Sequence, residues 1–206
     1  MRALSLLIVG ILLGGCSSGG DDVPLIRSGA EMGDVSRKAK KLSEEAFVRF
    51  DSGETLTADE KKNLRLASMQ FEGMAAFDPK AYGAFFGAGK CYFILEEFER
   101  AANRFEYAAT NAPLSDPAGK ATAAEAKYLA SICYERLNNF VLASDSAKTA
   151  VDLVPIAAQY HSQWASAELQ LNNEKEARKH LAQALKLNPE DKRALQLQRF
   201  LKALDK

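Results

Sequence analysis

Three prolines, each at the end of an amphipathic stretch, recur at nearly regular intervals, and this spacing constrains the fold more than any other feature. Pro155 and Pro189 lie 34 residues apart, and Pro113 lies 42 residues before Pro155. Alanines recur at fixed offsets before each proline, in the pairs Ala101 and Ala108, Ala143 and Ala150, and Ala177 and Ala184. This period predicts similar helical units that stack on one another, because no single unit can bury its apolar face alone.

Segment 82–115 shows the pattern most fully, with small and large residues alternating along it: Phe85, Gly89, Tyr92, Phe98, Ala101, Phe105, Ala108 and Pro113. Gly89 and Ala101 lack bulk where two antiparallel helices must approach, and Tyr92 fills the space around that contact. The pattern resembles the tetratricopeptide repeat, a helix-turn-helix unit of about 34 residues. The resemblance implies an all-α fold, a right-handed superhelical solenoid of helix pairs.

The repeat frame predicts a degenerate N-terminal helical repeat at 34–81, three repeats at 82–115, 124–157 and 158–191, and a capping helix at 192–206. In the degenerate repeat we expect helices at about 34–50 and 57–77. Thr57 and Glu60 form a capping box for the second of these helices. The last helix carries leucines at helical spacing and would cover the apolar edge of the final repeat.

Eight extra residues separate the first two full repeats, within the stretch from Ser115 to Thr122. Ser115 or Asp116 can cap a helix, and Pro117 suits a first helical turn. These residues favour a longer helix from near Pro117 to Leu137. A plain longer loop is the alternative, which Gly119 allows.

The third repeat departs from the pattern at two positions. Glu168 and Glu174 stand where the tetratricopeptide repeat usually has aromatic residues. We expect either a weaker first helix in this repeat or a small rotation that turns Glu168 outward.

The N-terminus has the three parts of a secretory signal peptide: the basic Arg2, an apolar run of about 11 residues, and small residues before a cleavage point. The sequence Leu13-Gly14-Gly15-Cys16 resembles the lipobox of bacterial lipoproteins. The resemblance implies a signal peptide at 1–15 and acyl chains such as palmitate on Cys16. An ordinary secreted protein cut near Gly15 is the alternative, whereas a transmembrane helix needs about 20 apolar residues.

The small polar residues that follow Cys16 predict a lipidated flexible tether at 16–33. By analogy with bacterial lipoproteins, Ser17 in place of an aspartate favours the outer membrane, facing the periplasm. The domain would then attach to a membrane only through its lipid anchor. The chain has 27 basic and 27 acidic residues, and this balance predicts no nucleic-acid partner.

No motif predicts an enzyme, a cofactor, a metal site or a small-molecule substrate. Gly87-Ala88-Gly89-Lys90-Cys91 resembles the end of a phosphate-binding loop, but Ala84 replaces its first glycine and Cys91 its Ser or Thr. We expect His161 and His180 to be surface or partly packed residues, since no Cys or carboxylate pattern accompanies them.

Cys91 and Cys133 occupy the same position of successive repeats. An oxidising compartment would permit a disulfide between them. Equivalent positions on stacked helices are about 8 to 10 Å apart, beyond the roughly 7 Å between Cα atoms that a disulfide spans. We therefore expect two buried free thiols.

Stacked first helices of tetratricopeptide proteins line a concave groove that holds a partner protein or peptide. The residues at the groove-facing positions of this chain are Phe86, Lys90, Phe93, Tyr128, Ile132, Glu135, Arg136, Ser162, Ser166 and Gln170. The set has an aromatic end and a polar end and shows no basic clamp for an acidic C-terminus. Alternatively, Phe86, Phe93 and Tyr128 pack beneath the extended helix or the N-terminal segment.

These features favour a membrane-anchored scaffold that binds a protein or peptide partner in the cell envelope. Lipoproteins of this kind resemble assembly factors for outer-membrane complexes or pili. A self-associating structural lipoprotein is a second hypothesis. An enzyme acting on envelope glycans, with paired carboxylates in the groove, is a third.

Overall fold

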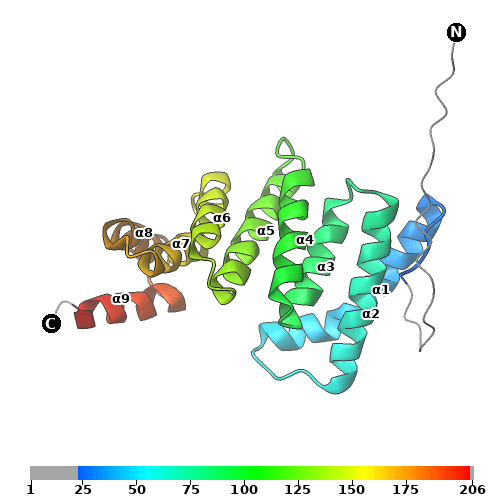
Figure 1. The fold of residues 1–206 in the computed structure, drawn as a ribbon, viewed down its shortest axis with the longest axis horizontal. Helices are drawn as coiled ribbons and strands as arrows, with labels where there is room; N and C mark the ends of the chain where they lie inside the picture. Colours follow the sequence, from blue (N-terminus) through cyan, green and yellow to red (C-terminus); the bar gives the residue numbers. More distant parts are fainter. Residues whose placement is uncertain (1–22, 205–206) are drawn as a thin grey trace, which may run out of the picture.

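The computed structural model describes residues 23–204, and this part of the chain folds into α-helices without a strand. The helices are α1 (Gly29–Asp51), α2 (Ala58–Phe77), α3 (Tyr82–Ile94), α4 (Phe98–Asn111), α5 (Pro117–Arg136), α6 (Phe140–Leu153), α7 (Ala158–Gln170), α8 (Glu174–Leu187) and α9 (Lys192–Leu204). Figure 1 shows them following one another from the blue N-terminal end to the red C-terminal end. The predicted all-α solenoid is confirmed.

Each helix packs against the next, and a second set of contacts joins the odd-numbered helices. α1 contacts α3, α3 contacts α5, α5 contacts α7, and α7 contacts α9. The odd-numbered helices therefore form one continuous face of the solenoid, which we call the inner row. The cap α9 also packs against α8.

Two helix starts follow directly from local sequence. The Thr57 hydroxyl accepts the Glu60 backbone N–H, and the Glu60 carboxylate accepts the Thr57 backbone N–H, so the capping box is present. At α5 the Asp116 carboxylate accepts the Gly119 N–H at 2.8 Å, with Pro117 in the first turn. The insertion is therefore a helical extension and not a loop.

The turns inside the three full repeats share one unusual backbone conformation. Glu96, Asn138 and Asn172 have φ angles of 62°, 58° and 61°. This left-handed region suits asparagine better than other non-glycine residues. Each turn lets the second helix of a repeat fold back on the first.

The small residues of the repeat pattern lie where the helices meet. All six alanines that precede the prolines are buried: Ala101, Ala108, Ala143, Ala150, Ala177 and Ala184. A Cβ atom on Gly89 would lie 2.7 Å from the Phe105 ring. Close approach of α3 and α4 therefore requires a glycine at this position.

The predicted tether at 16–33 is wrong in its C-terminal part. Helix α1 begins at Gly29, capped by the Ser28 hydroxyl, which accepts the Glu31 N–H. Before it, Ile26 is buried and Pro24 contacts Gly73 of α2. Residues 23–28, which we call the strap, lie on α2. Cys16 and the signal peptide fall outside the described residues.

Glu168 turns inward, so its predicted outward rotation is wrong. It is only 7% exposed, and its carboxylate accepts from Ser144, from Trp164 Nε1 at 3.0 Å and from Asn173 Nδ2 at 2.8 Å. The sequence pattern showed a missing aromatic residue and could not show these three donors. Glu174, in contrast, is exposed.

Cys91 and Cys133 are free and buried, as expected. Burial raises the pKa of each thiol to about 12. Both sulfurs pack in the main apolar core. Within residues 23–204, none of the helices has the length and apolar character needed to cross a membrane.

Candidate partner-binding groove

Within residues 23–204, a hollow opens on the inner row toward each end of the solenoid. The hollow between α1 and α3 has a volume of about 580 Å³. The hollow among α5, α7 and α9 has a volume of about 310 Å³. We call the first the apolar hollow and the second the polar hollow, after the side chains that line them.

The apolar hollow is walled by Phe47 and Val48 of α1 and by Phe86 of α3, above Phe71 of α2. Its floor depends on Gly87, because a Cβ atom there would lie 2.7 Å from the Phe71 ring. Val48 is 67% exposed. When a partner covers an exposed apolar side chain of this size, the burial lowers the free energy of the complex.

Charges of both signs surround the apolar hollow. Lys40 and Lys90 line it together with Glu44 and Asp51. The Lys90 ammonium lies 4.3 Å from the centroid of the Phe47 ring, a cation–π contact that links α3 to α1. The rim therefore offers donors and acceptors around an apolar centre.

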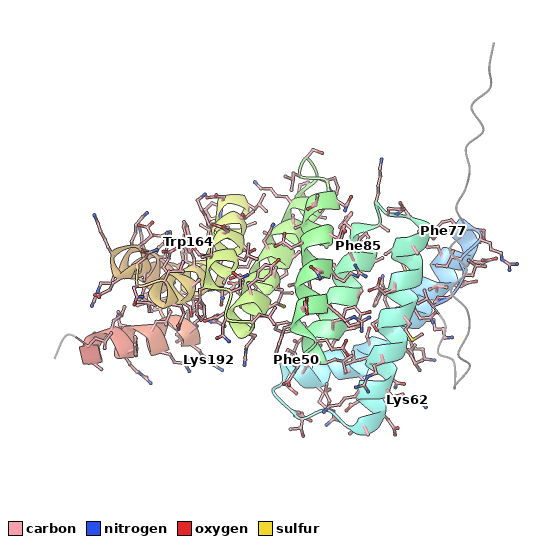
Figure 2. All side chains as sticks on the ribbon, viewed as in Figure 1. Phe50, Lys62, Phe77, Phe85, Trp164 and Lys192 are labelled. Carbon is pink, nitrogen blue, oxygen red and sulfur yellow. The ribbon has the colours of Figure 1, made fainter. Side chains whose placement is uncertain are left out.

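The three predicted residues at the aromatic end separate into two roles. Phe86 and Lys90 line the apolar hollow. Phe93 packs among aromatic rings, with its centroid 6.0 Å from Phe50, 6.1 Å from Phe98 and 6.4 Å from Phe105. Figure 2 shows Phe50 at the end of α1, beside the α3–α4 pair. Phe93 therefore packs against α1 and α4 and is not among the residues that line the apolar hollow.

Tyr128 joins α5 to α7. Its ring centroid lies 5.1 Å from that of Tyr160, whose hydroxyl donates to Glu125 at 2.8 Å. Burial raises the pKa of Tyr128. Tyr128 is half-buried and packs against the buried Tyr160 at a helix contact.

The polar hollow contains Ile132, Glu135, Arg136 and Ser166 of the predicted set. The remaining lining comes from α9, with Arg193, Gln196 and Leu197. Arg136 is exposed, and its guanidinium carbon lies 5.9 Å from the Phe98 centroid. The C-terminal cap thus forms one wall of this hollow.

Glu135 is the centre of the hydrogen-bond network in the polar hollow. Its carboxylate accepts from Gln163 Nε2 at 2.8 Å and from the Ser166 hydroxyl at 2.7 Å. Arg193 forms an ion pair with it at 3.2 Å and also donates to the Gln163 amide oxygen. The sequence pattern does not indicate Gln163 and Arg193, because they lie 28 and 58 residues from Glu135.

The last two predicted positions lie outside both hollows. Ser162 is 1% exposed, and its hydroxyl donates to the Gln159 carbonyl. It offers no free group to a partner. Gln170 is exposed at the end of α7.

A second polar cluster lies at the contact of α7 with α8. His161 and His180 are each 6% exposed, so the expectation of surface or partly packed histidines is wrong. Their Nδ1 atoms are 3.0 Å apart, and the Trp164 ring lies 3.6 Å from His180 between centroids. Residues 23–204 contain no group of three or more His, Cys, Asp or Glu arranged to hold a metal ion.

Comparison with known proteins gives no sequence family but a clear structural likeness. No protein-family model matches the chain, and no curated protein matches it in sequence. A crystal structure of MamA aligns with a TM-score of 0.56 and 15% identity, over 77% of this chain and 85% of that one. A MamA structure from Desulfovibrio magneticus RS-1 aligns at 0.50, with 17% identity, over 78% and 99%.

One similar structure contains a bound peptide. The first TPR of Spaghetti (RPAP3), bound to the HSP90 peptide SRMEEVD, aligns with a TM-score of 0.50 and 23% identity. The alignment covers 63% of this chain and 97% of that one. At these identities the comparisons establish the fold.

Proposed function

Because this chain has the tetratricopeptide fold, we propose that it is a scaffold that binds a protein or peptide partner on its inner row. The apolar hollow is the observation that carries the proposal. It places Phe47, Val48 and Phe86 on an open surface between two helices. The peptide bound to RPAP3 supports the view that this fold holds such a segment. The proposed function is binding without catalysis.

The two hollows would set the direction in which a partner lies. An apolar side chain would enter the hollow between α1 and α3, where burial stabilises it by about 25 cal/mol for each Å² removed from water. Polar groups of the partner would meet Arg136 and Gln196 at the other hollow. A segment with an apolar end and a polar end would therefore bind in one orientation.

We further propose that lipid on Cys16 holds the scaffold at the outer membrane, facing the periplasm. The lipobox supports this anchor. The strap starts at Val23, so the chain between Cys16 and the folded domain spans at most about 25 Å when extended. Two or three acyl chains would make such an attachment durable. A scaffold at the outer membrane would assist the assembly of an envelope complex, such as an outer-membrane complex or a pilus.

A matched pair of glycine variants tests the binding surface. A Cβ atom on Gly83, which lines the apolar hollow, would have no neighbour within 4 Å, and the same holds for Gly29 outside it. Gly83→Leu should fill the hollow and leave the fold intact, whereas Gly29→Leu adds the same side chain elsewhere. We expect Gly83→Leu alone to weaken partner binding, by tenfold or more.

Photo-crosslinking in intact cells would identify the partner for that measurement. A reactive residue at the exposed Val48 samples the apolar hollow, and one at the exposed Tyr107 of α4 samples a helix outside the inner row. An envelope protein captured only from Val48 supports the proposal. Equal capture from both positions, or unchanged binding by Gly83→Leu, contradicts it.

The anchor is tested separately. Cys16→Ser should move the protein from the membrane fraction to the soluble fraction and leave binding by the purified domain unchanged. If Cys16→Ser stays with the outer membrane, the lipid anchor is wrong and the binding surface remains a separate question.

A further inference from the structure

His161 and His180 form a hydrogen-bonded pair that joins α7 to α8. Their Nδ1 atoms face each other at 3.0 Å. The two outer nitrogens are also occupied: His161 Nε2 lies 3.0 Å from the Pro155 carbonyl oxygen, and His180 Nε2 lies 3.2 Å from Glu176 Oε1. Both rings are buried, and Trp164 stacks on His180; Figure 2 labels Trp164 on α7.

The number of protons in this arrangement is fixed by its acceptors. A carbonyl oxygen only accepts, so His161 Nε2 must carry a proton. An ionised carboxylate also only accepts, so His180 Nε2 must carry one as well. The contact between the two Nδ1 atoms needs a third proton. Two neutral imidazoles have two protons in all, so the complete set of bonds holds one extra proton and a single positive charge.

A second extra proton does not fit. It would place an N–H group on each Nδ1 atom, and two donors would then face each other at 3.0 Å. The two positive charges would repel at the same place, in a site with little water to screen them. Protonation of both rings therefore requires the rings to separate.

We propose that the His161–His180 pair is an acid-sensitive contact, which joins α7 to α8 with one shared proton and opens when a second proton binds. The contact does not depend on the identity of any partner. It would loosen the last repeat as the surroundings become acidic.

Among the charged groups of the neighbouring helices, Lys179 lowers the pKa of His180, and Glu176 raises it. Glu176 of α8 accepts from His180 and from Lys179 Nζ at 2.6 Å, and the Lys179 hydrogen bond lowers the pKa of Glu176. On α6, Lys148 and Asp152 pair with each other at exposed positions. Glu168 of α7 is occupied by Trp164, Ser144 and Asn173. On α5 and α9, Glu135 and Arg193 pair in the polar hollow.

Burial and then the charge of His161 lower the pKa of His180. An unfolded histidine titrates near 6.5. Below that pH the unfolded chain binds protons that the folded pair rejects, so stability falls as the pH drops from about 6.5 toward the lowered pKa.

Opening of the pair would reach the inner row through α7. The same helix holds Gln163 and Ser166 against Glu135 in the polar hollow. A shift of α7 relative to α8 would move both donors. Opening of the pair would thus alter the polar hollow.

Trp164 gives a direct optical test, because it is the single tryptophan of the chain and it stacks on His180. A protonated imidazole quenches indole emission more strongly than a neutral one. The emission of the purified full-length protein is measured from pH 8 to pH 4 for the wild type, His180→Gln and His161→Gln. We expect quenching with a midpoint below about 6.5 in the wild type, a higher midpoint in His161→Gln, and no such transition in His180→Gln.

Two results would overturn the proposal: coincident curves for the wild type and His180→Gln, or a midpoint in His161→Gln that is no higher than in the wild type. If the variants do not fold, the wild-type protein decides by NMR titration of its imidazole nitrogens. Two steps separated by more than one pH unit support a coupled pair. Two superimposed titrations near pH 6.5 contradict it.

Discussion

The Phe105 ring lies where a side chain on Gly89 would have to be, with ring carbons 2.7 Å from the position of a Cβ atom. The corresponding pairs in the next two repeats are Ser131 with Ala147 and Ala165 with Leu181. The largest side chain of the three, Phe105, thus faces the residue without a side chain. The α3–α4 contact is therefore complementary in size.

Gly89→Ala should therefore destabilise the protein by about 1 to 3 kcal/mol, since the added methyl overpacks the α3–α4 contact. Urea unfolding followed by circular dichroism measures the loss. The double variant Gly89→Ala with Phe105→Leu should cost less than the sum of the two single changes, because the smaller side chain makes room. Additive costs would show that the two residues do not share this space.

Glu96→Asn should stabilise the protein by about 0.5 to 1 kcal/mol. Glu96 has a φ angle of 62°, and a non-glycine residue other than asparagine or aspartate is strained in this region. The equivalent turns already carry Asn138 and Asn172. The reciprocal change Asn138→Glu is the control and should lower stability by a similar amount; two shifts of the same sign would contradict the backbone explanation.

Glu168→Ala should lower the free energy of unfolding by about 2 to 4 kcal/mol, because it removes a buried carboxylate that accepts from Ser144, Trp164 and Asn173. Glu174→Ala is a matched change at an exposed position of the same repeat and should alter stability by about 0.5 kcal/mol or less. Chemical denaturation of both variants under one condition makes the comparison. Equal effects would mean that the burial of Glu168 is unimportant.

Cys91 and Cys133 should resist alkylation in the folded protein. With a pKa of about 12, each thiol is ionised in only about one molecule in 10,000 at pH 8, and the thiolate is the reactive form. Mass spectrometry after treatment with iodoacetamide should find both thiols unmodified in buffer and modified in urea. Failure to modify them in urea, with recovery after reduction, would reveal a disulfide instead.

Repeat positions and helix caps were predictable because they depend on residues that are close in sequence. The alanines before each proline, Thr57 with Glu60, and Asp116 before Pro117 all act within one or two helical turns. Local spacing is enough to place such elements.

The polar clusters were not predictable, because they join residues from different helices. Arg193 reaches Glu135 across 58 residues, and His161 meets His180 across 19. A single sequence gives the helical face on which such a residue lies but not the rotation that selects its partner. The start of α1 was missed for a related reason, since the strap is fixed by the contact of Pro24 with Gly73 and not by its own periodicity.

In a solenoid each unit is expected to interact only with its immediate neighbours, so that the ends fray one unit at a time. The ion pair of Arg193 with Glu135 departs from that rule, because it joins the cap α9 to α5, beyond the helix pair between them. Removal of α9 would expose the apolar edge of the last repeat and would also take a charged partner from the repeat before it. Loss of the last helix would therefore disturb α5 as well as the repeat that α9 covers.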